Sequence, residues 1–170
     1  MPVAVRTFVR WVDAINYRVG RVAMYLLFVM GAILLYSTLS RVLFGVPVNW
    51  VMEMSQFMLS AYYLLGGAYS MQLNAHVRMD LFYGMMKPKT RAITDSFTIL
   101  FVIFYLVVLF WGGVSSTDYS ITYNQKNYTA WAPVLWPIKV IMTLGIFMML
   151  LQTIAQFFKD VAEARGKPIA

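Results

Sequence analysis

The feature that most constrains this sequence is residues 54–75, an uninterrupted run between Glu53 and His76 with no ionisable side chain stronger than tyrosine. At about 1.5 Å per helical residue, this run covers the roughly 30 Å hydrocarbon core of a bilayer. Composition agrees: 61% of the 170 residues are hydrophobic, 12% are charged and the mean hydropathy is +0.66. A soluble domain carries about 25% charged residues. The run therefore predicts a membrane-spanning helix.

Three further runs have the length and apolar character of membrane spans, at about 22–40, 96–117 and 138–158. We therefore predict an all-α integral membrane protein, with four transmembrane helices in a single membrane domain over residues 1–170. Basic residues gather near the N-terminus, in the 77–95 connection and in the 159–170 tail. By the positive-inside rule, both termini and the tail are expected in the cytoplasm.

Residues 1–21 predict a basic amphipathic helix lying in the headgroup region, separate from the first span. Its apolar side chains recur at helical spacing, and its charged side chains turn elsewhere; the apolar set is Phe8, Trp11, Val12, Ile15 and Val19, and the charged set is Arg6, Arg10, Asp13 and Arg21. A cleaved signal peptide is the alternative, but the apolar run that follows is too long and lacks a small-residue cleavage site. A second interfacial helix, broken at Pro88 and followed by a turn, is expected over 77–95.

Small and polar side chains form a stripe along the second span, at steps of three and four residues: Gln56, Ser60, Tyr63, Gly67, Ser70 and Asn74. A second stripe, on the fourth span, contains Gly145, Gln152 and Gln156. In membranes, such stripes allow close backbone approach and interhelical hydrogen bonds worth ~0.6 kcal/mol each. We therefore predict helix-packing interfaces. The helix on the other side can belong to this chain or to a partner protein, and the sequence leaves both open.

Chemically reactive side chains are scarce, since the chain has no cysteine and one histidine. This excludes disulfides, thiolate metal sites and a bis-histidine haem. His76 and Asp80 stand four residues apart, but two ligands are too few for a metal site. No nucleophile–base arrangement or phosphate-binding loop is evident. We predict a non-enzymatic protein with no cofactor and no metal, and no nucleic-acid binding, because the basic residues flank apolar runs.

Glu53 and Arg41 are among the charged residues expected on the side opposite the termini. Glu53 opens the second span, where a carboxylate complements the positive end of a helix. Arg41 lies there against the overall charge bias. We expect Arg41 to pair with Glu53 or Asp118, or to bind a lipid phosphate.

Several short motifs occur in order along the chain. They are Arg41 to Gly45 (RVLFG), then Trp50 and Glu53, then Leu65 to Ala68 (LGGA), then His76 to Leu81 (HVRMDL). In this order, and with four spans, the chain resembles the small membrane subunit (Q subunit, DctQ-like) of tripartite ATP-independent periplasmic (TRAP) transporters over essentially its whole length. It departs from that pattern at Met52, where the family often has a second carboxylate, and at Gln72, where an arginine often precedes the histidine.

The resemblance implies that this chain lies in a bacterial inner membrane and has two protein partners. One is a large permease subunit with the substrate and sodium sites, and the other is a periplasmic solute-binding protein that delivers a carboxylate-bearing solute. The small subunit would brace the permease among membrane lipids. Its periplasmic edge would contain Arg41, Trp50 and Glu53, and its cytoplasmic edge His76, Arg78 and Asp80. The alternative is a self-sufficient homo-oligomeric carrier or channel, but such a protein normally places a carboxylate at membrane depth, and this chain has none there.

Overall fold

The computed structural model describes residues 3–73 and 88–164 and is all-helical, as predicted. It contains α1 (Val3–Phe44), α2 (Trp50–Gln72), α4 (Pro88–Thr122) and α5 (Trp136–Ala164). No strand occurs within these two ranges, and the β-type pairing they contain is an isolated bridge between Lys126 and Val134 in the loop that joins α4 to α5.

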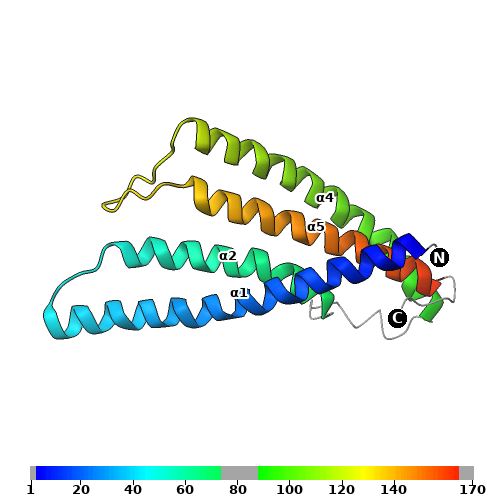
Figure 1. Cartoon of the computed structure of the whole chain (residues 1–170), viewed down its shortest axis with the longest axis horizontal. Helices are drawn as coiled ribbons and strands as arrows, with labels where there is room; N and C mark the ends of the chain where they lie inside the picture. Colours follow the sequence, from blue (N-terminus) through cyan, green and yellow to red (C-terminus); the bar gives the residue numbers. More distant parts are fainter. Residues whose placement is uncertain (1–2, 74–87, 165–170) are drawn as a thin grey trace.

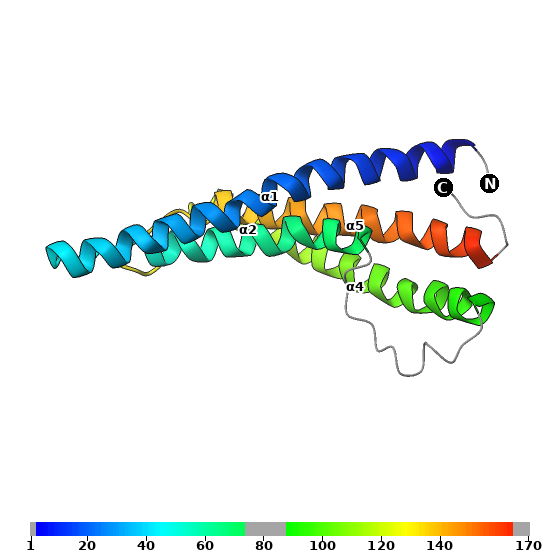
Figure 2. The same ribbon diagram turned by 90° about the horizontal axis from the view of Figure 1, so that it is seen from below.

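The helices form two antiparallel pairs, α1 with α2 and α4 with α5 (Figure 1). The two pairs meet through α2 and α5, which run in the same direction, so α1 and α4 lie on the outside. Figure 2 shows that the first half of α1 also approaches α5. The start of α1 and the end of α5 lie at one end of the bundle, and the loops 45–49 and 123–135 lie at the other.

Three of the helices are long and apolar enough to cross a membrane: Val5–Phe44, Phe97–Thr122 and Trp136–Ala162. Helix α2 has 23 residues but is not among these three. Its sequence explains the difference, because its serines, tyrosines and glutamines lower the mean hydropathy of the helix. The four-span prediction is therefore supported for three helices by length and composition.

Helix α1 does not have the boundary expected near residue 21. It continues without a break through Arg21 and Val22, for 42 residues in all. No proline interrupts it, and the isolated Gly20 is tolerated within a helix. Tyr69 of α2 occupies the space a side chain at position 20 would need, because a Cβ there would lie 2.3 Å from the Cβ of Tyr69.

The apolar face of the first half of α1 packs inside the protein. Val9 and Val12 are each 2% exposed and form a core cluster with the fully buried Ala155 of α5. Phe8 also packs against this cluster, whereas Trp11 is 64% exposed. The amphipathic pattern of residues 1–21 is thus used for helix packing.

Helix α4 begins at Pro88, and no turn follows this residue. Proline is favoured at the first position of a helix, because its missing N–H has no partner there and its φ angle is already helical. The turn expected after Pro88 is therefore replaced by the first turn of α4. The interfacial helix expected before it falls on residues 77–87, which lie outside the described residues.

Candidate functional site

Polar side chains from two helices meet near the end of the bundle where α1 begins and α5 ends. Asp13 accepts hydrogen bonds from Lys159 Nζ at Oδ2 (2.7 Å) and from Gln152 Nε2 at Oδ1 (2.9 Å). Asn16 Nδ2 donates to Gln152 Oε1 at 2.6 Å. We call these four residues the polar junction. It joins α1 to α5, and α2 adds a hydrogen bond from Gln72 Nε2 to the backbone oxygen of Asp13 at 3.2 Å.

The polar junction is mostly screened from solvent. Asn16 is 2% exposed and Gln152 is fully buried, while the side chains of Asp13 and Lys159 are about one quarter exposed. Buried polar groups are tolerated when they are hydrogen-bonded, and removing one member leaves its partners unsatisfied. The junction therefore fixes the first half of α1 against α5.

The sequence indicated only part of this junction. Gln152 belongs to the predicted stripe on the fourth span, but Asp13 was expected to turn away from the apolar face, and the structure corrects this. Asp13 and Asn16 lie three residues apart, on the face that also carries Val9 and Val12. Two polar residues within an otherwise apolar helix face are the signal that could have identified the junction.

The predicted stripes divide between contacts inside the chain and exposed positions. A Cβ on Gly67 would lie 2.9 Å from Met149 Sδ, and a Cβ on Gly145 would lie 2.9 Å from the Cβ of Leu64, so α2 and α5 approach closely at both glycines. Gln156 Nε2 donates to Asp160 Oδ1 at 2.8 Å. Gln56 and Tyr63 are exposed, and Ser60 and Ser70 are half-buried. Asn74 lies outside the described residues.

At the opposite end of the bundle, Glu53 points inward from the first turn of α2. It is 6% exposed, and its Oε2 has no hydrogen-bond partner among the described residues. Arg41 was expected to pair with Glu53 or Asp118, but the structure has no ion pair between Arg41 and either of these residues. Arg41 is exposed in the last turn of α1, where a cation complements the helix C-terminus.

Other predicted edge residues are placed in part. Trp50 is half-buried at the start of α2. His76, Arg78 and Asp80, the expected cytoplasmic edge, lie outside the described residues. Within residues 3–73 and 88–164, no group of three or more His, Cys, Asp or Glu side chains could hold a metal ion.

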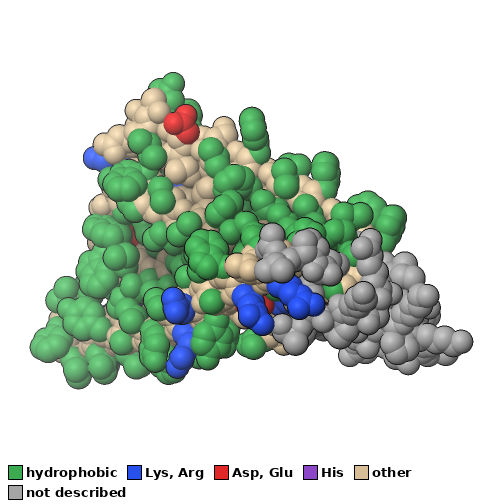
Figure 3. Space-filling view, turned by 45° about the vertical axis from the view of Figure 1, so that its right-hand side comes forward, with side chains coloured by type: hydrophobic (Ala, Val, Ile, Leu, Met, Phe, Trp, Pro, Cys, Tyr) green, Lys and Arg blue, Asp and Glu red, His purple; other side chains and the backbone are tan. Residues whose placement is uncertain are grey.

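The outer helices present apolar surfaces (Figure 3). On α1, Phe28 is 72% exposed and Leu35 is 66% exposed; on α4, Phe104 is 70% exposed and Trp111 is 80% exposed. Contiguous apolar surface of this kind is incompatible with water and requires lipid or protein against it. The faces of α1 and α4 are therefore available for lipid or for another subunit.

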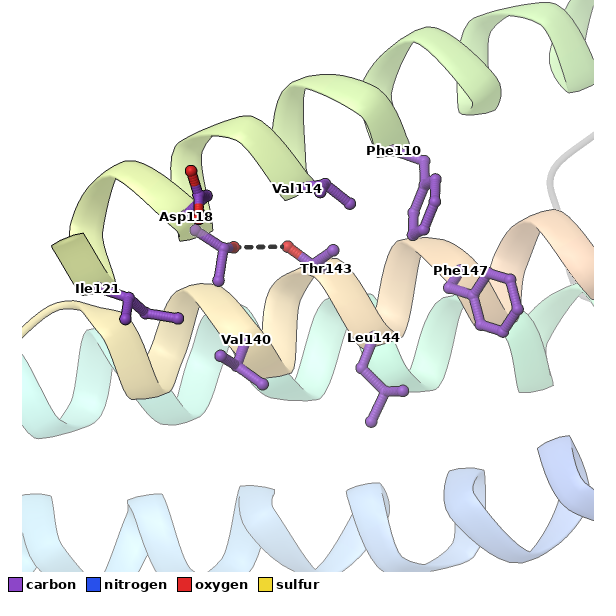
Figure 4. Close-up of a pocket in the computed structure, with 9 residues that line it drawn as sticks. Phe110, Val114, Asp118, Ile121, Val140, Thr143, Leu144 and Phe147 are labelled. Carbon is purple, nitrogen blue, oxygen red and sulfur yellow. Dashed lines mark hydrogen bonds between the residues drawn. The ribbon is translucent and has the colours of Figure 1, made fainter.

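A groove of about 460 Å³ lies between α4 and α5 (Figure 4). Most of its lining is apolar, from Phe110, Val114, Ile121, Val140, Leu144 and Phe147. The polar residues that line it are Thr117, Thr143 and Asp118. Thr117 and Thr143 satisfy each other through a 3.0 Å hydrogen bond. The groove has no arrangement of nucleophile and base.

Residues 30–163 match the family model described as "Tripartite ATP-independent periplasmic transporters, DctQ component". This match includes the second half of α1 and nearly all of α2, α4 and α5. A search of curated proteins found no match to the chain.

Proposed function

Because this chain belongs to the DctQ family of tripartite ATP-independent periplasmic transporters, we propose that it is the accessory subunit that braces the large permease of a sodium-coupled uptake system. DctQ components work with a large membrane subunit and a solute-binding component. In our proposal the permease carries the substrate and sodium sites, and this chain acts without catalysis, cofactor or metal. The transported solute carries a carboxylate, and the membrane is the bacterial inner membrane.

The observation that carries this proposal is the contrast between the outer surface and the interior of the helix bundle. Apolar faces of α1 and α4 are open, while the polar side chains of the junction are used in bonds within the chain. The predicted spans contain no Asp or Glu at membrane depth that could carry a coupling ion. A chain of this kind offers packing surface, and the coupling chemistry belongs to a partner.

We also propose an orientation of the chain in the membrane. Helix α2 completes four spans, both termini face the cytoplasm, and the loops 45–49 and 123–135 face the periplasm. Arg41, Trp50 and Glu53 then lie at the periplasmic edge, and the periplasmic surface around the exposed Arg41 helps to dock the solute-binding protein. His76, Arg78 and Asp80 lie at the cytoplasmic edge. The exposed members of the α2 stripe, Gln56 and Tyr63, contact the permease.

The test is to tag the chain at its C-terminus in its native host, extract it in mild detergent and identify what co-purifies. We expect a large multi-span permease in about equal amount. Deleting the chain should abolish solute uptake, and a plasmid-borne copy should restore it. Recovery of a homo-oligomer alone in several mild detergents, or normal uptake after deletion, would contradict the accessory role.

A further inference from the structure

We propose that the groove between α4 and α5 binds an acyl chain of a phospholipid whose headgroup carries an amine, such as phosphatidylethanolamine. This inference needs α4 and α5 to lie in a membrane, and both have the length and composition for that. It does not depend on the permease partner.

The groove is suited to a hydrocarbon chain. Its walls are formed by aromatic and aliphatic side chains that extend from Phe110 and Phe147 at one end to Ile121 and Val140 at the other (Figure 4). The two hydroxyls in it need no ligand, since Thr117 bonds to Thr143 and also donates to the Gly113 backbone oxygen at 2.7 Å. In a bilayer, such a groove opens toward acyl chains.

The size of the groove favours a lipid chain over a protein helix. Its volume of about 460 Å³ falls within the range of about 300–1,000 Å³ that is usual for small-molecule sites. A helix with its side chains is about 10–12 Å across, so it could lie over the groove but could not enter it without separating α4 from α5. A single extended chain can enter between the two helices.

The charge at one end of the groove selects the headgroup. Asp118 lies at this end, within the last residues of α4 before the 123–135 loop, and makes no ion pair among the described residues. The last turn of α4 has no basic residue. A carboxylate near the negative end of a helix dipole favours a cation.

The neighbouring cation of the protein is engaged elsewhere. Lys139 precedes Val140 of the groove, but its Nζ donates to Gln125 Oε1 at 3.0 Å and to the Ser116 backbone oxygen at 3.4 Å. Asp118 is therefore free to receive the ammonium of a lipid headgroup, while the acyl chain of that lipid fills the groove.

The experiment is native mass spectrometry of the purified chain from nanodiscs that contain equal amounts of phosphatidylethanolamine and phosphatidylglycerol. We expect the wild-type chain to retain phosphatidylethanolamine preferentially. Asp118→Asn should reduce this preference about two- to fivefold, the size of effect a single charge has at a helix terminus. Val114→Phe should reduce total retained lipid by filling the groove. Val108→Phe, also on exposed α4 surface but outside the groove, should retain as much lipid as wild type.

Two outcomes would overturn the proposal. One is an unchanged lipid preference in Asp118→Asn together with equal lipid loss in Val114→Phe and Val108→Phe. The other comes from Leu144→Cys, which provides a unique thiol because the chain has no cysteine. If a photo-crosslinker on that thiol joins the large subunit and no lipid in the assembled transporter, the groove is a protein interface. The accessory role would survive either outcome.

Discussion

At the scale of single residues, the polar junction places hydrogen-bonded polar side chains in the interior of the bundle. Gln152 is fully buried, and bonds Asp13 through its Nε2 and Asn16 through its Oε1. Gln152→Leu removes both bonds at once, and we expect the free energy of unfolding to fall by about 1–3 kcal/mol, because buried partners lose their hydrogen bonds. Thermal unfolding in detergent measures this. Gln56→Leu is the control, since Gln56 is exposed and should change stability by less than about 0.5 kcal/mol. Equal effects would contradict the role of the junction.

Two glycines of the helix bundle, Gly145 of α5 and Gly66 of α2, differ sharply in their surroundings. A Cβ on Gly145 would lie 3.0 Å from the backbone carbon of Leu64, whereas a Cβ on Gly66 meets nothing within 4 Å. Gly145→Ala should destabilise the chain by about 1–3 kcal/mol, because backbone cannot move aside easily. Gly66→Ala should be neutral or up to about 1 kcal/mol stabilising in the isolated chain, since alanine is the better helix former. The same unfolding assay compares them, and a stable Gly145→Ala would contradict the close approach of α2 and α5.

At the scale of elements, the unbroken helix α1 is the main difference from the sequence-based expectation. Val22 is 65% exposed, so its side chain contributes little packing. Val22→Pro should nevertheless cost about 3 kcal/mol, because proline removes a backbone hydrogen bond within a helix. Val22→Ala is the control for loss of the side chain. If residues 3–21 formed a separate helix, the proline would be tolerated, and hydrogen exchange of residues 14–30 would distinguish the two cases.

At the scale of the whole molecule, the proposed orientation of the chain in the membrane can be tested directly. The two loops lie at one end of the bundle, and the start of α1 and the end of α5 lie at the other (Figure 1). Single cysteines can be introduced without background, because the natural chain has none. In intact cells stripped of their outer membrane, Lys126→Cys in the 123–135 loop should react with a membrane-impermeant maleimide. Arg10→Cys should react only after the inner membrane is opened. The reverse pattern would contradict cytoplasmic termini.

The sequence by itself determined the class of this protein, because the length and apolar character of a helix are local properties. Runs such as 96–117 and 138–158 predict membrane helices before any contact is known, and the ordered motifs from Arg41 to Leu81 indicated the family that residues 30–163 then matched. Of the stripe residues, Gly67 and Gly145 lie where α2 and α5 approach closely, while Gln56 and Tyr63 are exposed.

Only the tertiary structure decided which neighbours the predicted helix faces contact. The sequence pattern of an amphipathic helix is the same whether its apolar face lies on lipid headgroups or on another helix. The packing of Val9 and Val12 against Ala155 therefore depended on the position of α5. The bond between Asp13 and Lys159 joins residues 146 positions apart, and no local pattern specifies that pairing. Partner choice between helices follows from the packing of the whole bundle, because each helix satisfies its own backbone hydrogen bonds and leaves only its side chains to select a neighbour.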